Sequence, residues 1–145
     1  GDDTSLRVSI SSTAGDSFLV WLAAPLGEAL RPGVYKKAER APFRTGRSPG
    51  LDISGNGAGC NEIWGSFVIN QIETTGSSIS RLHATFVQHC ESPRAPTFSG
   101  ALLYQALPLK LTERLAYGRR LNAFRVDRTN GVTCLAWRGE HRQYA

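Results

Sequence analysis

The chain has 145 residues, 41% of them apolar, with 17 Lys and Arg against 12 Asp and Glu and a formal net charge of +5. A charged fraction of 20%, with large apolar residues throughout, excludes a disordered tail, a coiled coil and a collagen-like chain. A chain of this length can bury a core without metals or many crosslinks. Its longest apolar run, Phe18–Pro25, is far shorter than the roughly 18 residues of a membrane helix, so we expect no transmembrane segment.

The positive charge is concentrated in two segments. Residues 31–47 and residues 110–145 each carry a net charge of +5. Such patches attract anionic partners, but arginine-rich loops are more often solvated surface. We therefore expect no specific nucleic-acid binding, and the role of the two patches stays open.

Apolar residues in the first part of the chain alternate with polar ones, a pattern that indicates strands. One alternating run covers Leu6–Ile10, and a turn leads from it into a second run at Phe18–Ala23. Prolines and glycines divide the segment that follows. Only short strands fit between them, at Gly33–Lys36 and Leu51–Ile53.

The two longest strand candidates are Trp64–Ile72 and Ile79–Cys90, joined by a hairpin turn at Thr74–Ser77. They should pair antiparallel, and side-chain alternation gives the second strand a core face of Leu82, Ala84, Phe86 and Cys90. Its other face carries Arg81, His83, Thr85 and His89.

Two further elements follow, at Phe98–Ala106 and Leu109–Arg120. The first has the pattern of a strand. The second is the one candidate helix, with Gly118 as its stop signal, although residues 107–112 also alternate as a strand would.

The last part of the chain predicts a β-hairpin, because Asn130-Gly131 is a favoured pair for a type I′ turn. With those two residues at the centre of the turn, Val126 would face Leu135 and Phe124 would face Trp137. Cys134 would then lie on the opposite face, beside Arg125 and Asp127.

These elements predict an all-β fold, an antiparallel β-sandwich or its barrel-like variant, with a C-terminal β-hairpin. We expect a β-sandwich domain over residues 1–106. Residues 107–145 form a C-terminal extension that contains the hairpin at 124–138, packed on the same domain.

The pairing of the three cysteines indicates in which cellular compartment the protein resides. Antiparallel pairing of the long strands brings Cys60 and Cys90 to the same end of the sheet, where a disulfide can form, and a disulfide indicates an oxidising compartment. Cys134 is then a free thiol, half of an intermolecular bridge, or the true partner of one of the others. The alternative is three reduced cysteines in a cytosolic protein. A start at Gly1 without Met suggests a removed signal peptide.

Several short motifs carry a resemblance to known proteins. They include Pro32-Gly33-Val34-Tyr35, Ser54-Gly55-Asn56-Gly57-Ala58-Gly59-Cys60-Asn61 and Gln88-His89-Cys90-Glu91. In this order, over residues 18–106, the chain resembles a domain of uncharacterised secreted bacterial proteins. The resemblance implies an all-β extracellular or cell-surface module in which Cys60 and Cys90 pair, and it carries no established activity. Residues 115–118 and 131–134 are similar to another family of small secreted actinobacterial domains.

The motifs for specific chemistry are incomplete. Residues 52–57 resemble the start of a calcium-binding loop, with oxygen-bearing side chains at alternate positions and then a glycine. The twelfth position is Ile63, which excludes an EF-hand. An irregular calcium site using Asp52, Asn56 and Asn61 remains as the alternative. We expect structural roles for His83, His89 and His141. No nucleophile elbow or zinc motif occurs in the sequence, so we predict no cofactor and no metal, and favour a noncatalytic protein.

Aromatic rings that are exposed at the surface are candidates for sugar binding, because they stack on sugar rings while neighbouring arginines donate hydrogen bonds. The candidate ligand-binding residues are Trp21, Tyr35, Trp64, Arg40 and Arg44. We predict a secreted or cell-surface module that binds a surface polysaccharide or a protein. The alternatives are a structural subunit that self-assembles by strand addition, crosslinked through Cys134, and a secreted hydrolase.

Overall fold

The computed structural model describes residues 3–11, 15–106, 122–128 and 131–138, the last two ranges as backbone only. The alternating segments form strands, and one turn of 3₁₀ helix, η1, covers Ala41–Phe43. The strands are β1 (Ser5–Ser11), β2 (Ser17–Ala23), β3 (Gly33–Arg40), β4 (Gly50–Gly55), β5 (Ile63–Thr75), β6 (Ser78–Cys90), β7 (Thr97–Tyr104), β8 (Asn122–Arg128) and β9 (Gly131–Arg138).

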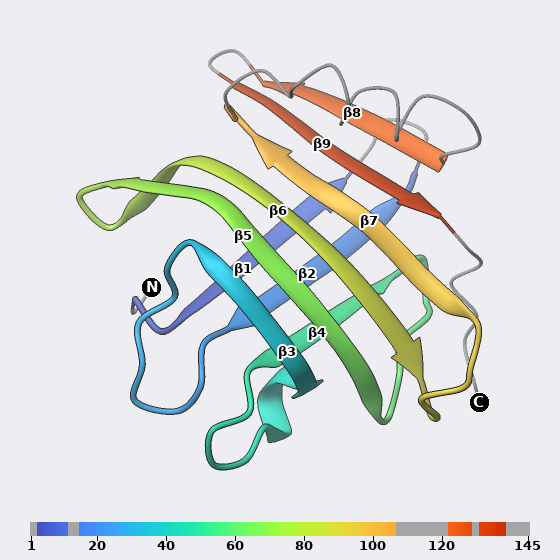
Figure 1. Cartoon of the computed structure of the whole chain (residues 1–145). Coiled ribbons are helices and arrows are strands. Elements are labelled where there is room, and N and C mark those ends of the chain that lie inside the picture. Colours follow the sequence, from blue (N-terminus) through green and yellow to red (C-terminus); the bar gives the residue numbers. More distant parts are fainter. Residues whose placement is uncertain (1–2, 12–14, 107–121, 129–130, 139–145) are drawn as a thin grey trace.

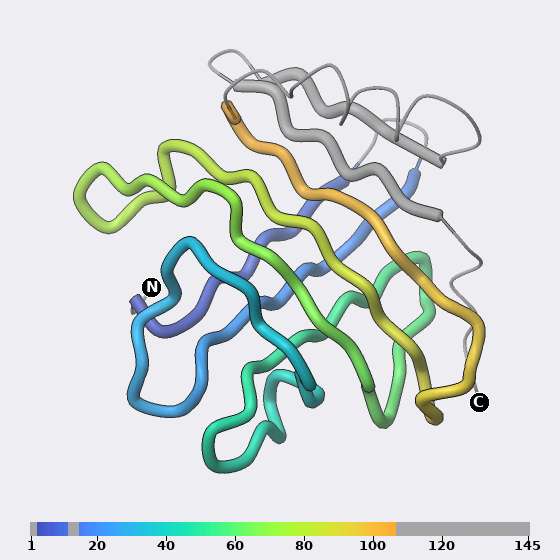
Figure 2. The backbone as a smooth tube through the Cα atoms, in the orientation of Figure 1, coloured from blue at the N-terminus to red at the C-terminus, as the bar shows by residue number. Residues whose placement is uncertain are grey.

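All of these strands belong to one sheet in the order β1-β2-β4-β3-β5-β6-β7-β9-β8. The sheet curls into a half-barrel, so that β1, β2 and β4 lie behind β3, β5 and β6 and cross them (Figure 1). The smooth backbone trace shows the same two layers (Figure 2). Among the described strands only β3 and β4 pair parallel. The all-β prediction, with its barrel-like variant, is confirmed.

The core lies between the two layers. Each strand points one set of alternate residues inward, and these sets form one hydrophobic cluster. Its most completely buried large members are Phe67, Leu22, Leu51, Ile53, Ile69, Leu82, Leu102 and Val20. Burial of these side chains is the main favourable term in the folding of this half-barrel.

The two halves of the sheet meet at a short junction between β3 and β4. Their parallel ladder pairs only Glu39 with Gly50 and Arg40 with Leu51. The backbones approach closely here, because a Cβ added to Gly50 would lie 2.8 Å from the Cα of Ala41. A Cβ on Gly65 of β5 would lie 2.7 Å from a methyl carbon of Leu51. The junction therefore requires glycine at both positions.

Beyond this ladder, the side chain of Gln88 takes the place of a neighbouring strand. Ile53 of β4 donates its N–H to Oε1 of Gln88 at 3.0 Å, and its C=O accepts from Nε2 at 3.0 Å. Gln88 lies on β6 and is completely buried. Its amide therefore pairs with the backbone of β4 as a peptide group would, and it connects the two layers through the core.

Most of the predicted strands are confirmed, and several are longer than expected, β3, β4 and β5 most of all. The β5–β6 hairpin is present, with its turn at Gly76 and Ser77 between the two strands. β3 continues to Arg40 although its alternation stops earlier. The cause is a bulge between Tyr35 and Ala38, where Lys37 takes a φ of +54°. A bulge adds one residue and so shifts the period-two pattern.

The C-terminal hairpin forms, but its expected register is wrong by two residues. Val126 pairs with Thr133 and Phe124 with Leu135, while Arg125 lies opposite Cys134. β9 also pairs with β7, where Leu102 lies opposite Leu135. The register of the hairpin therefore depends on β7 as well as on the Asn-Gly turn. β9 thereby joins the sheet built by residues 1–106. The predicted helix at 109–120 lies outside the described residues.

Replacement of Gln88 tests the bridge between the layers. In Gln88→Ala, the buried N–H and C=O of Ile53 lose their partners, and each unpaired group costs about 1–3 kcal/mol. We expect the free energy of unfolding, measured in urea, to fall by about 3 kcal/mol or more. Gln71→Ala, on the partly exposed part of β5, serves as the control and should change it by less than about 0.5 kcal/mol. Equal effects of the two substitutions would contradict the bridge.

Candidate functional site

The predicted disulfide between Cys60 and Cys90 is present in the structure. It joins Cys60, in the segment before β5, to Cys90, the last residue of β6. Their Cα atoms are 5.2 Å apart. Cys60 is 2% exposed, and Nε2 of Gln88 also contacts its sulfur at 3.3 Å. The disulfide therefore lies directly beside the bridge between the layers, and neither cysteine remains as a partner for Cys134.

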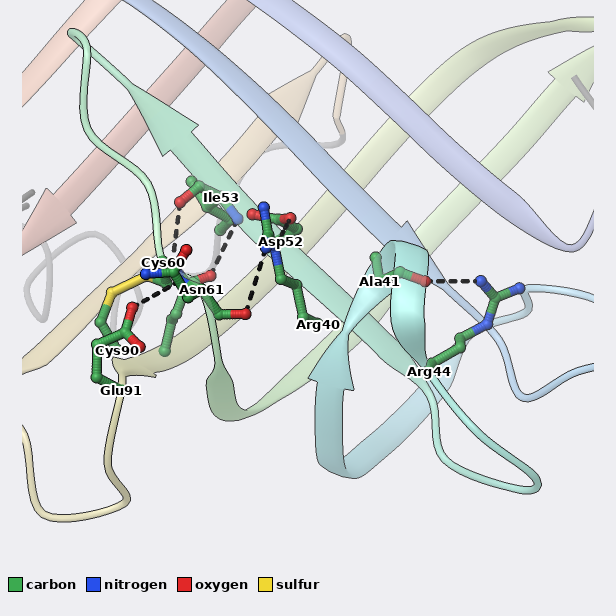
Figure 3. Close-up of polar contacts among 10 residues, drawn as sticks. Arg40, Ala41, Arg44, Asp52, Ile53, Cys60, Asn61, Cys90 and Glu91 are labelled. Atoms are coloured by element: carbon green, nitrogen blue, oxygen red, sulfur yellow. Dashed lines mark hydrogen bonds and ion pairs between the residues drawn. A yellow bond between two sulfur atoms is a disulfide. The ribbon is translucent and has the colours of Figure 1, made fainter. Parts of the chain in front are cut away.

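A chain of polar contacts continues from the disulfide to the β3–β4 junction (Figure 3). The carboxylate of Glu91 accepts the N–H of Asn61 at 2.6 Å. The Asn61 carbonyl accepts from Nη1 of Arg40 at 3.3 Å, and Nε of Arg40 pairs with the carboxylate of Asp52 at 3.1 Å. Asp52 is the neighbour of Ile53 on β4. These contacts extend the short junction, and we call them the junction network.

Three of the five predicted ligand-binding residues have hydrogen-bond partners within the chain. Arg40 belongs to the junction network. Arg44 donates to the carbonyls of Ala24 and Ala41 at 3.0 Å each. Tyr35 stacks on Phe67 with ring centroids 4.5 Å apart, and its hydroxyl bonds to the backbone of Arg31. The geometry gives all three a structural role.

The residues of the possible calcium site are also bound internally. Asp52 pairs with Arg40. Asn56, at a φ of +52°, accepts the N–H of Ser17 at 2.9 Å and donates to Asp16 at 3.0 Å. Its side chain thereby ties the glycine-rich loop to the start of β2. Within the described part of the chain, no group of three His, Cys, Asp or Glu residues could hold a metal ion.

Trp21 lies on the outer surface of the rear layer. The guanidinium carbon of Arg7 is 3.5 Å from the centroid of its ring, a cation–π contact between β1 and β2. The Trp21 side chain is half-buried, and its Nε1 is enclosed with no hydrogen-bond partner among the described residues. Since Arg7 covers this ring, Trp21 presents little surface to a ligand.

Trp64 is different, because it lies uncovered on the outer surface of the front layer and is 38% exposed. The strand register places it in an array of nine outward positions, none of them buried and none carrying Asp, Glu, Lys or Arg. We call this array the Trp64 face. Its three rows are Trp64, His89 and Thr97; Ser66, Val87 and Ser99; and Val34, Val68 and Thr85.

The sequence analysis identified Trp64 and placed Thr85 and His89 on the outward side of their strand, but it missed the other members of this face. Val34 is 62% exposed and Val87 is 37% exposed, although valine in a strand is usually interpreted as core. Strand alternation alone marks them as outward, because the inward residues of β6 are Leu82, Ala84 and Phe86. The missing information was the pairing that brings the four strands β3, β5, β6 and β7 side by side.

The histidines of β6 have distinct surroundings. His89 lies beside Trp64, and its Nδ1 bonds the Ala95 carbonyl at 2.8 Å. Because a carbonyl only accepts, Nδ1 carries the proton and Nε2 is the acceptor of the neutral ring. His83 is 8% exposed despite its place on the outward side of β6. His141 lies outside the described residues.

The basic segment 31–47 contains one carboxylate, Glu39, that anchors its own loop. Glu39 accepts from the backbone N–H of Thr45 at 2.8 Å and from its hydroxyl. Burial raises the pKa of this carboxyl, but the hydrogen bonds from the Thr45 backbone and from the Ser48 and Thr45 side chains lower it by more. The pKa of Glu39 therefore lies below its ordinary value. The carboxylate form therefore holds the loop.

Comparison with protein-family models, curated proteins and solved structures finds no match to this chain. The described residues contain no helix that combines the length and the apolar character needed to cross a membrane. The arrangement of the site residues is thus the basis for a functional proposal.

Removal of the disulfide should destabilise the fold. The bond joins residues 30 positions apart, and closing such a loop stabilises by about 3 to 4 kcal/mol in the chain-entropy model. We expect the double substitution Cys60→Ala, Cys90→Ala to lower the free energy of unfolding by that amount in urea titration. The control is Cys134→Ser, which leaves the bond intact. A double variant as stable as the control would contradict the predicted contribution.

The Glu39 anchor predicts a pH dependence. Since the pKa is lower in the folded chain than in the unfolded chain, the contribution to stability is present above the unfolded pKa and is lost as pH falls through the folded pKa. Glu39→Gln should therefore flatten the decline of unfolding free energy between about pH 5 and pH 3. Glu28→Gln, at an exposed carboxyl, should leave the slope as it is; an unchanged slope in Glu39→Gln would disprove the anchor.

Proposed function

We propose that this protein is a noncatalytic extracellular module that binds a neutral polysaccharide through the Trp64 face. The observation that carries the proposal is an exposed indole within an array of strand residues that carries no Asp, Glu, Lys or Arg. Sugar rings present C–H groups that pack on an aromatic face, and their hydroxyls need partners of both hydrogen-bonding kinds.

The neighbours of Trp64 supply those partners. Ser66, Thr85, Thr97 and Ser99 offer hydroxyls that both donate and accept, and Nε2 of His89 accepts. Most side chains around Trp64 are short, and the face extends over four strands, which suits an extended chain of sugars. The uncharged character of the face favours a neutral saccharide over an acidic one.

The basic residues nearest the face lie at its margin. Lys36 and Lys37 are exposed in the bulge of β3, next to Ser66 on β5. A ligand held by these lysines would be anionic, and its affinity would fall as salt screens the charges. A neutral ligand on the Trp64 face would bind with little dependence on salt, so salt dependence distinguishes the two.

The hydrolase alternative finds less support in the geometry. Glu91 and His89 are the groups that an acid–base mechanism would use in this region, and each has a structural contact, Glu91 with the N–H of Asn61 and His89 with the Ala95 carbonyl. The disulfide at Cys60 and Cys90 supports an extracellular location, because such bonds persist in oxidising compartments.

Trp64→Ala tests the proposed face directly. The probes are soluble xylan, mannan, amylose and hydroxyethyl cellulose, with polygalacturonate as the acidic member, and binding is measured by calorimetry at two salt concentrations. For the neutral polymer that the wild type binds, we expect Trp64→Ala to weaken the affinity at least about tenfold, or roughly 1.4 kcal/mol.

Phe43→Ala is the matched control, since it removes another exposed ring, 67% exposed, from η1 and not from the face. This control should bind as the wild type does, and so should the double variant Lys36→Ala, Lys37→Ala. Wild-type binding by Trp64→Ala, or binding of polygalacturonate alone, would refute the proposal.

A further inference from the structure

We propose that β1 is a self-association edge, through which two copies of this chain pair antiparallel across a two-fold axis at Val8. The inference goes beyond the proposed binding function and rests on different residues. Among the strands that the structure describes, β1 stands at the end of the order and pairs with β2 alone.

The hydrogen-bond pattern identifies the backbone groups on the open edge. The N–H of Ala24 donates to the Thr4 carbonyl at 2.9 Å, in register with the β1–β2 ladder. In an antiparallel pair, hydrogen-bonded positions alternate, so Leu6, Val8 and Ile10 bond to β2. Arg7, Ser9 and Ser11 therefore turn their N–H and C=O groups away from β2.

Within Ser5–Ser11, β1 lacks a bulge, a proline and an outward-reaching charge, although the Leu30 loop bonds the Asp3 carbonyl just before the strand at 2.6 Å. Its pairing with β2 runs without a bulge over the whole strand, and the strand contains no proline. Its one charged side chain, Arg7, is stacked on Trp21 and so extends over β2, away from the open edge. Open, regular edges of this kind are templates for another strand.

A second copy fits this edge in one favoured register. With Val8 on the two-fold axis, Arg7 of each chain lies opposite Ser9 of the other, and both pairs are of the hydrogen-bonded kind. An axis at Arg7 would place two arginines opposite each other, which is repulsive. An axis at Ser9 would move the pairing to the end of the strand.

The same register brings the two Val8 side chains together. Val8 points toward the core side but is only partly buried, because it lies in the edge strand. Across the axis it would meet Val8 of the second copy, whereas Leu6 and Ile10 are already buried in the core of their own chain. The pairing uses the same edge on both copies, so it closes as a dimer and does not grow into a filament.

Proline at an outward position tests the edge selectively. The N–H of Ser9 faces away from β2, so Ser9→Pro removes an intermolecular donor while it preserves the β1–β2 ladder. Ser9→Ala is the matched control. Light scattering and sedimentation on the full chain, in a Cys134→Ser background that excludes bridging by that thiol, should show a dimer for Ser9→Ala. Ser9→Pro should dissociate at least tenfold more readily, with an unchanged far-UV spectrum.

A crosslinking experiment tests the register even if the Ser9→Pro variant fails to fold. Non-hydrogen-bonded pairs lie closest across antiparallel strands, within the Cα separation of a disulfide. Val8→Cys, in the same background, should therefore form a covalent dimer on mild oxidation, whereas Ser9→Cys should not. A monomer at every concentration, a filament, equal dimerisation of Ser9→Pro and Ser9→Ala, or crosslinking of Ser9→Cys alone would each overturn the proposal.

Discussion

The fold depends on one buried amide. The sheet changes direction where β3 meets β4, and the ladder at that point ends after Leu51, while Ile53 still turns its N–H and C=O away from β2. A strand edge inside a hydrophobic core would leave these groups unpaired, at a cost comparable to that of several good contacts. Gln88 removes the cost, because a primary amide has the donor and the acceptor of a peptide group in the same geometry.

The position of the disulfide and the junction network follows from this constraint. Gln88 lies two residues before Cys90, and its amide also touches Cys60, so the crosslink fixes the strand that carries the bridge. Arg40 and Asp52 continue the junction at the surface. Polar residues that look like ligands in the sequence, such as Arg40, therefore join the two layers. The surfaces that we propose for partners are the uncharged Trp64 face and the edge of β1. A dimer through β1 would carry two Trp64 faces and bind a polymer with avidity.

The features predicted correctly from the sequence are those that a local residue pattern encodes. Alternation located most of the strands, and the cysteine positions on two long antiparallel strands indicated their pairing. The length of β3 was missed because the bulge at Lys37 breaks the pattern, and the C-terminal register was missed because β7 helps to set it. The roles of Arg40, Arg44 and Tyr35 depend on contacts between residues distant in sequence, such as Arg44 with Ala24, and no spacing along the chain records them.

Hydrogen exchange at Ile53 tests the central constraint most directly. Its N–H has Gln88 as partner, whereas alternation gives the next amide, Ser54, a partner in β2. If the Gln88 amide completes the junction, Ile53 will exchange only through global unfolding and as slowly as Ser54. Exchange at Ile53 many times faster than at Ser54, under conditions where the core of β6 stays protected, would show that β4 has an open edge and that Gln88 does not bridge the layers.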